Sequence, residues 1–133
     1  MRACLSAIAI FVLSASAARA QEGDAESAPV REISPVELSA LIKASSVQIL
    51  DCNEEENFVW AHVPGARLVA YDQITPAVLP GDKSATVVFY CYSPECPAAG
   101  MAAQSALKLG HTHVLLMTAG IVGWQDAGLP TEP

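Results

Sequence analysis

The sequence predicts a single α/β domain in which helices flank a mainly parallel sheet. Strand-like apolar segments alternate with helical segments between residues 33 and 133, a pattern typical of parallel sheets. Hydrophobic residues make up 52% of the chain and charged residues 16%, which is enough for a buried core and excludes a disordered chain. The length of 133 residues fits one domain.

Four segments are expected to form strands, at residues 47–50, 68–70, 86–90 and 113–117. The third is the strongest, because β-branched and aromatic residues follow one another in it. It ends at Cys91. Ligands of parallel sheets bind beyond the carboxyl ends of the strands, so the topology places Cys91 where a site is expected.

Helix signals separate these strands. Ser34 can cap a helix that starts at Pro35, and Glu37 can reach back to complete a capping box. The other helical segments are expected at residues 54–60, 97–109 and 121–127. We expect Phe58 and Trp60 to point inward from the first of these.

Residues 1–20 are typical of a cleaved secretory signal. Arg2 gives the positive start, residues 5–13 form an apolar run, and Ala18-Arg19-Ala20 is a small-x-small cleavage pattern. A retained membrane anchor needs about 20 apolar residues, and this run is shorter. We therefore expect an exported, periplasmic or secreted protein without a membrane span, in which residues 21–32 form a flexible leader.

Removal of the signal changes both the charge and the cysteine count. Loss of Arg2 and Arg19 leaves 5 of the 7 basic residues against 14 acidic ones, so the formal net charge goes from −7 to −9. This acidity argues against binding to nucleic acid or to anionic membranes. Three cysteines remain: Cys52, Cys91 and Cys96. In an oxidising compartment cysteines pair or react, and because their number is odd, at least one of them has no internal partner.

The loop after Cys91 leads into a helix at Pro97. Backbone N–H groups of such a loop, together with the positive end of the helix, can stabilise a thiolate. A buried, inert cysteine is an equally good interpretation of this placement alone.

Three motifs resemble the rhodanese-like sulfurtransferase family. They are Ile49-Leu50-Asp51 with the acidic run ending in Phe58, Ala61-His62-Val63-Pro64-Gly65-Ala66, and Ala119-Gly120-Ile121-Val122-Gly123-Trp124 followed by Ala127-Gly128-Leu129-Pro130. Val88-Phe89-Tyr90-Cys91 is similar to the strand that enters the catalytic loop of the family. Together these motifs cover residues 33–133 in the family's order.

The resemblance implies a five-stranded parallel sheet and sulfur transfer without a cofactor. Cys91 would be the nucleophile that carries sulfane sulfur as a persulfide between a small sulfur-containing donor and a thiol acceptor. The sequence also leaves a protein partner of unknown identity open. Loop backbone N–H groups would hold the anionic sulfur; they belong to Tyr92, Ser93, Glu95 and Cys96.

The loop departs from the family pattern in its charge. The family commonly has Cys-Arg-x-Gly-x-Arg, and here Tyr92, Pro94 and Cys96 replace the two arginines and the glycine. Glu95 adds a negative charge, and Asn53 stands where the family often carries another arginine. Because sites for dianions normally use arginine, we expect thiosulfate to be a poor donor.

Other polar residues are expected to be structural. Asp51 should hold the region after its strand, and His62 should fix the following turn by hydrogen bonds. Trp124 should pack in the core. His111 and His113 have no third clustered ligand, so no metal site is expected.

The sequence leaves three functions open: sulfur transfer through Cys91, thiol–disulfide exchange through Cys91 and Cys96, and a catalytically silent binding module. The loop could bring the two cysteines within the roughly 4.4–6.8 Å between Cα atoms that a disulfide needs. We predict that Cys91 and Cys96 can form an internal, reducible disulfide; the alternative is that Cys96 packs at the helix start with its sulfur turned away. Cys52 is expected to stay unpaired.

We predict that the mature protein begins at Gln21 and is found outside the cytoplasm, because Ala18-Arg19-Ala20 fits signal peptidase. N-terminal sequencing of the protein from the culture's soluble exported fraction checks this. A membrane-bound product that begins at Met1 would contradict it.

Overall fold

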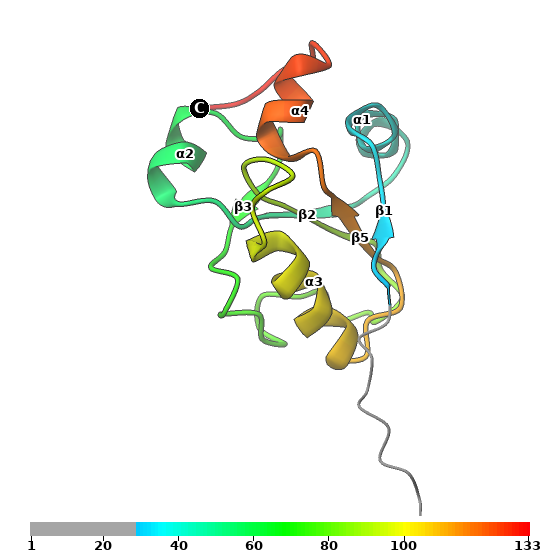
Figure 1. Ribbon diagram of the computed structural model, residues 1–133. Coiled ribbons are helices and arrows are strands. Elements are labelled where there is room, and N and C mark those ends of the chain that lie inside the picture. The colour runs from blue at the N-terminus through cyan, green and yellow to red at the C-terminus, as the bar shows by residue number, and fades with distance from the viewer. Residues whose placement is uncertain (1–28) are drawn as a thin grey trace, which may run out of the picture.

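The computed structural model describes residues 29–133. Its core is a five-stranded sheet with the order β1-β5-β4-β2-β3, in which all neighbouring strands are parallel (Figure 1). The strands are β1 Arg31–Glu32, β2 Gln48–Asp51, β3 Arg67–Leu68, β4 Val87–Tyr90 and β5 Val114–Met117. The helices are α1 Pro35–Ala44, α2 Glu55–Trp60, α3 Ala98–Lys108 and α4 Gly120–Asp126. The expected α/β fold with five parallel strands is confirmed.

The expected signal at residues 1–20 and most of the leader at 21–32 lie outside the described residues. The end of the leader is corrected, because Arg31 and Glu32 form β1 and pair with Leu115 and Leu116 of β5. Both β1 side chains are exposed, so no apolar alternation marks this edge strand in the sequence. Within residues 29–133, no helix has the length and apolar character needed to cross a membrane.

Two apolar cores lie on opposite faces of the sheet. On one face, α3 packs its alanines against β2, β4 and β5. On the other face, α1 and α4 pack Leu38, Ile121 and Trp124 against the same strands. Trp124 is 1% exposed, and its Nε1–H donates to the carbonyl of Pro130 at 2.8 Å. Helices therefore cover both faces of the central strands (Figure 1).

Two local predictions, the capping box of α1 and the inward placement of Trp60, have different outcomes in the structure. The capping box of α1 is confirmed, with Glu37 N–H donating to Ser34 Oγ and Ser34 N–H donating to Glu37 Oε2. The inward placement of Trp60 is wrong, because this side chain is 74% exposed. Residues two apart on a helix point about 200° apart, so Phe58 and Trp60 cannot both face the core.

The start of α4 lies directly on the chain that leaves β4. The N–H groups of Ile121 and Val122 donate to the carbonyls of Cys91 and Tyr92 at 2.9 and 3.0 Å. Gly120 has φ +67°, and a Cβ there would lie 2.4 Å from the carbonyl oxygen of Tyr92. Only glycine permits this approach, which fixes the path of the chain immediately after Cys91.

We predict that Gly120→Ala destabilises the protein more than Gly128→Ala does. Both glycines have similar positive φ, +67° and +71°, but a Cβ at Gly128 meets nothing within 4 Å. Positive φ costs both variants about 1–2 kcal/mol, and the backbone clash adds about 1–3 kcal/mol for Gly120→Ala alone. Urea unfolding of the two variants measures this difference, and equal losses would contradict the contact.

A candidate active site around Cys91

Cys91 lies at the carboxyl end of β4, the central strand of the sheet. The register pairs Tyr90 with Asp51 of β2 and with Met117 of β5, so three strands end at the same level. Cys91 is 5% exposed. The fold thus places this sulfur where the sequence predicted a site, beneath the loop that leads to α3.

A buried hydrogen-bond network holds the segments next to Cys91. The Tyr90 hydroxyl donates to Asp51 Oδ2 and accepts the Val63 N–H at 3.1 Å. Asp51 Oδ1 accepts from the backbone and side-chain nitrogens of Asn53, at 2.8 and 2.7 Å. Burial raises the pKa of Asp51, although the hydrogen bonds from Tyr90 and Asn53 oppose this shift. The sequence pointed to Asp51 but gave no sign that Tyr90 is its partner.

His62 forms hydrogen bonds with two segments, the preceding helix α2 region at Phe58 and the segment at Glu132. Its Nδ1–H donates to the carbonyl of Phe58 at 2.9 Å, and its ring stacks on the Phe58 ring with centroids 3.9 Å apart. The backbone of His62 exchanges two hydrogen bonds with that of Glu132, at 2.8 and 2.9 Å. These contacts are those of a residue that fixes the turn.

Cys91 and Cys96 form a disulfide, with their Cα atoms 6.2 Å apart. The predicted pairing is therefore confirmed, and Cys52 remains a free, buried thiol as expected. Burial, with a smaller effect of the Asp51 charge, raises the pKa of Cys52 to about 12. Cys52 is thus a thiol that stays protonated at physiological pH.

The loop between the two cysteines contains a tight turn. The Cys96 N–H donates to the Ser93 carbonyl at 3.1 Å, with Pro94 at the second position of the turn, which proline favours. The Cys96 N–H is therefore bonded within the loop, and its expected binding of sulfur stays a prediction. The Ser93-Pro94 pair is a turn signal present in the sequence. The N–H groups of Tyr92, Ser93 and Glu95 remain candidates for sulfur binding.

A hollow of about 190 Å³ opens beside the disulfide. Among residues 29–133, no lysine, arginine or histidine lines it; the lining residues are Cys91, Ser93, Pro94, Cys96, Pro97, Ala99, Gly100, Leu116, Met117 and Thr118. The Cys91 sulfur also lies 3.8 Å from two oxygens, the carbonyl of Cys52 and Oδ1 of Asn53. The site therefore lacks the positive charges that would attract a dianion.

Glu95 makes the loop more negative. Its carboxylate accepts a hydrogen bond from the Ser93 hydroxyl at 2.8 Å, which lowers the pKa of Glu95. Because Glu95 is exposed and ionised at neutral pH, it repels anionic donors that approach the loop.

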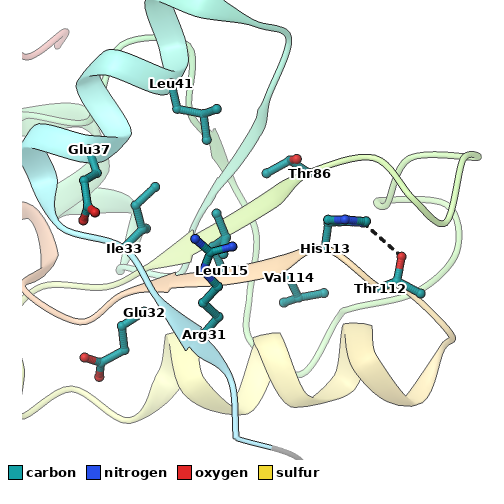
Figure 2. Close-up of a pocket in the computed structure, with 10 residues that line it drawn as sticks. All are labelled: Arg31, Glu32, Ile33, Glu37, Leu41, Thr86, Thr112, His113, Val114 and Leu115. Carbon is teal, nitrogen blue, oxygen red and sulfur yellow. Dashed lines mark hydrogen bonds between the residues drawn. The ribbon is translucent and has the colours of Figure 1, made fainter.

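A second hollow, of about 340 Å³, lies away from the cysteines (Figure 2). It is bounded by α1 and by the β1–β5 side of the sheet, near the amino ends of β4 and β5, and Thr112 bonds to His113 within it. Among residues 29–133, no three potential metal ligands gather there or elsewhere. None of the cysteines that the structure describes lines this hollow.

Comparisons with known proteins agree with this geometry. A family model described as "Rhodanese-like domain" matches residues 34–127. An uncharacterized protein from Synechocystis is 30% identical over 99 residues, which are 74% of this chain and 54% of that protein. This chain therefore spans about half the length of that curated relative.

Solved structures show the same fold. A thiosulfate sulfurtransferase from Pseudomonas aeruginosa is 28% identical with a TM-score of 0.67, and the match covers 78% of this chain and 19% of that one. The BH2092 protein from Bacillus halodurans is 25% identical with a TM-score of 0.68, covering 77% and 76%. A rhodanese-like domain protein from Staphylococcus aureus is 23% identical with a TM-score of 0.61, covering 78% and 100%. This chain belongs to the rhodanese-like domain family.

Proposed function

We propose that this protein is a sulfurtransferase that carries sulfane sulfur as a persulfide on Cys91. The observation that carries the proposal is the position of Cys91, at the carboxyl end of the central strand and in the wall of the hollow beneath the loop. The similarity to a thiosulfate sulfurtransferase, at 28% identity, supports the same reaction class.

The reaction begins with the reduced protein, since a disulfide-bonded Cys91 cannot attack. The Cys91 thiolate forms a bond to the sulfane sulfur of the donor, and the bond between that sulfur and the rest of the donor breaks. The donor leaves as a thiolate or another anion. A thiol acceptor then attacks the outer sulfur of the persulfide, takes that atom and restores the Cys91 thiolate.

The donors that fit the site best are neutral or thiol-bound sulfane compounds. The lining of the hollow has no basic side chain to bind a dianion such as thiosulfate, and Glu95 adds negative charge at the loop. A small thiol or a cysteine of a partner protein would serve as acceptor. Export would place this reaction outside the cytoplasm.

The disulfide favours a second candidate function, thiol–disulfide exchange with Cys91 and Cys96 as the redox pair. That function needs no sulfane sulfur. A protein that oxidises and reduces test dithiols but forms no persulfide would be a redox protein, and one that does neither would be the silent binding module.

We predict that Cys91→Ser abolishes sulfur transfer. In a Cys96→Ser background, which cannot form the Cys91–Cys96 disulfide, the reduced protein freed of reductant should transfer sulfur from glutathione persulfide to cyanide faster than the uncatalysed reaction, measured as thiocyanate. The Cys91→Ser variant should show only the uncatalysed rate because it lacks the nucleophile. Cys52→Ala is the matched control and should retain most activity, since Cys52 is a buried thiol with a pKa raised to about 12. Full activity of Cys91→Ser would refute the proposal.

We predict that Tyr92→Arg improves the use of thiosulfate. Tyr92 is 46% exposed on the loop, so a guanidinium there can reach an anionic donor. A charge-assisted hydrogen bond contributes about 1.5–3 kcal/mol, which corresponds to about ten- to a hundred-fold in kcat/KM for thiosulfate. Tyr71→Arg is the control, because Tyr71 is similarly exposed, at 42%, and lies outside the loop from Cys91 to Cys96. An equal gain in both variants, or none in Tyr92→Arg, would contradict the electrostatic argument.

A further inference from the structure

We propose that Cys96 is a resolving thiol that converts the Cys91 persulfide into sulfide and a disulfide. This inference rests on the proposed function, because it requires a persulfide on Cys91. It changes the product, since the sulfur atom leaves as sulfide instead of passing to an acceptor. The protein would then act as a reductase of thiol-bound sulfane sulfur.

The first support is that the loop returns Cys96 to Cys91. The two sulfurs are bonded in the structure, across Cα atoms 6.2 Å apart. The turn from Ser93 to Cys96 brings Cys96 back towards Cys91. Pro94 is the second residue of this turn, and its ring fixes the backbone φ angle that the turn needs. A thiol that can bond to Cys91 Sγ can also attack that atom when it carries a second sulfur.

The second support is the local environment of Cys96. Cys96 lines the same hollow as Cys91 and is half-buried, so a donor or a reductant can approach the pair. It lies two residues before α3, an 11-residue helix whose positive end favours a thiolate nearby. The family commonly has an arginine at this loop position, and the chain has a second nucleophile there instead.

The third cysteine does not fit this role. Cys52 is buried and unpaired in the structure, and its pKa is raised to about 12. Its sulfur therefore stays a protonated thiol, which is a poor nucleophile in thiol exchange.

The atoms and electrons of the reaction balance as follows. The Cys96 thiolate attacks Sγ of Cys91, the bond between Cys91 Sγ and the sulfane sulfur breaks, and that sulfur leaves as hydrosulfide. The two cysteine sulfurs lose two electrons in forming the disulfide, and the sulfane sulfur gains them in becoming sulfide. An external dithiol then reduces the disulfide by exchange and is itself oxidised to a disulfide.

A single-turnover experiment tests this inference. The full mature chain is reduced with a dithiol, freed of reductant without oxygen, and mixed with one equivalent of glutathione persulfide. We measure released sulfide, remaining protein thiols and intact mass. Wild-type protein should release close to one sulfide per chain and recover the Cys91–Cys96 disulfide. Cys96→Ser and Cys96→Ala should each gain one sulfur atom and keep it, with at least a ten-fold loss of sulfide release.

Matched variants and the other outcomes separate the two proposals. Cys52→Ala should release sulfide as the wild type does, and far-UV circular dichroism checks that every variant is folded. A stable persulfide on wild-type protein, with Cys96 still a free thiol, would overturn the resolving role and leave the proposed sulfur transfer intact. Equal sulfide release by wild type and both Cys96 variants would also overturn it. If neither wild type nor the folded Cys96 variants take up sulfur, the proposed function itself fails.

Discussion

The buried carboxylate of Asp51 joins the segments on which the site depends. It accepts hydrogen bonds from Tyr90 at the end of β4 and from Asn53 beyond β2, and Tyr90 in turn accepts the Val63 N–H. A buried carboxylate is costly unless its oxygens are satisfied, so these groups are constrained to stay together. Cys91 directly follows Tyr90, and its position is therefore determined by this network and by the parallel register of β2 and β4.

The second constraint comes from the start of α4. The first N–H groups of α4 donate to the carbonyls of Cys91 and Tyr92, and Gly120 lets the two backbones touch. The chain leaving β4 is thus held at Tyr90 by the Asp51 network and at Cys91 and Tyr92 by α4, before it turns at Pro94. The chemistry at the end of the loop is free to differ from the family, because this support uses backbone atoms and not the loop's side chains.

The loop differs from the family pattern at Cys96, where a thiol stands in place of a positively charged arginine. Without arginine in the loop or in the hollow, the site offers little attraction to a dianion. The disulfide between Cys91 and Cys96 instead makes the reactivity of Cys91 depend on reduction. Sulfur chemistry and thiol redox chemistry therefore share one pair of atoms, and the two functions that the sequence kept separate become consecutive steps in our proposals.

The sequence by itself determined the α/β class, the capping box of α1, the placement of Cys91 after the strongest strand, and the unpaired state of Cys52. These features depend on local patterns: apolar runs, capping residues and the spacing of cysteines. Only the tertiary structure decided that Arg31 and Glu32 pair with β5, that Trp60 faces solvent, that Tyr90 bonds Asp51, and that Cys96 turns towards Cys91. Each of these depends on what lies opposite a residue in space, and a hydrophobic pattern along the chain carries no information about that partner.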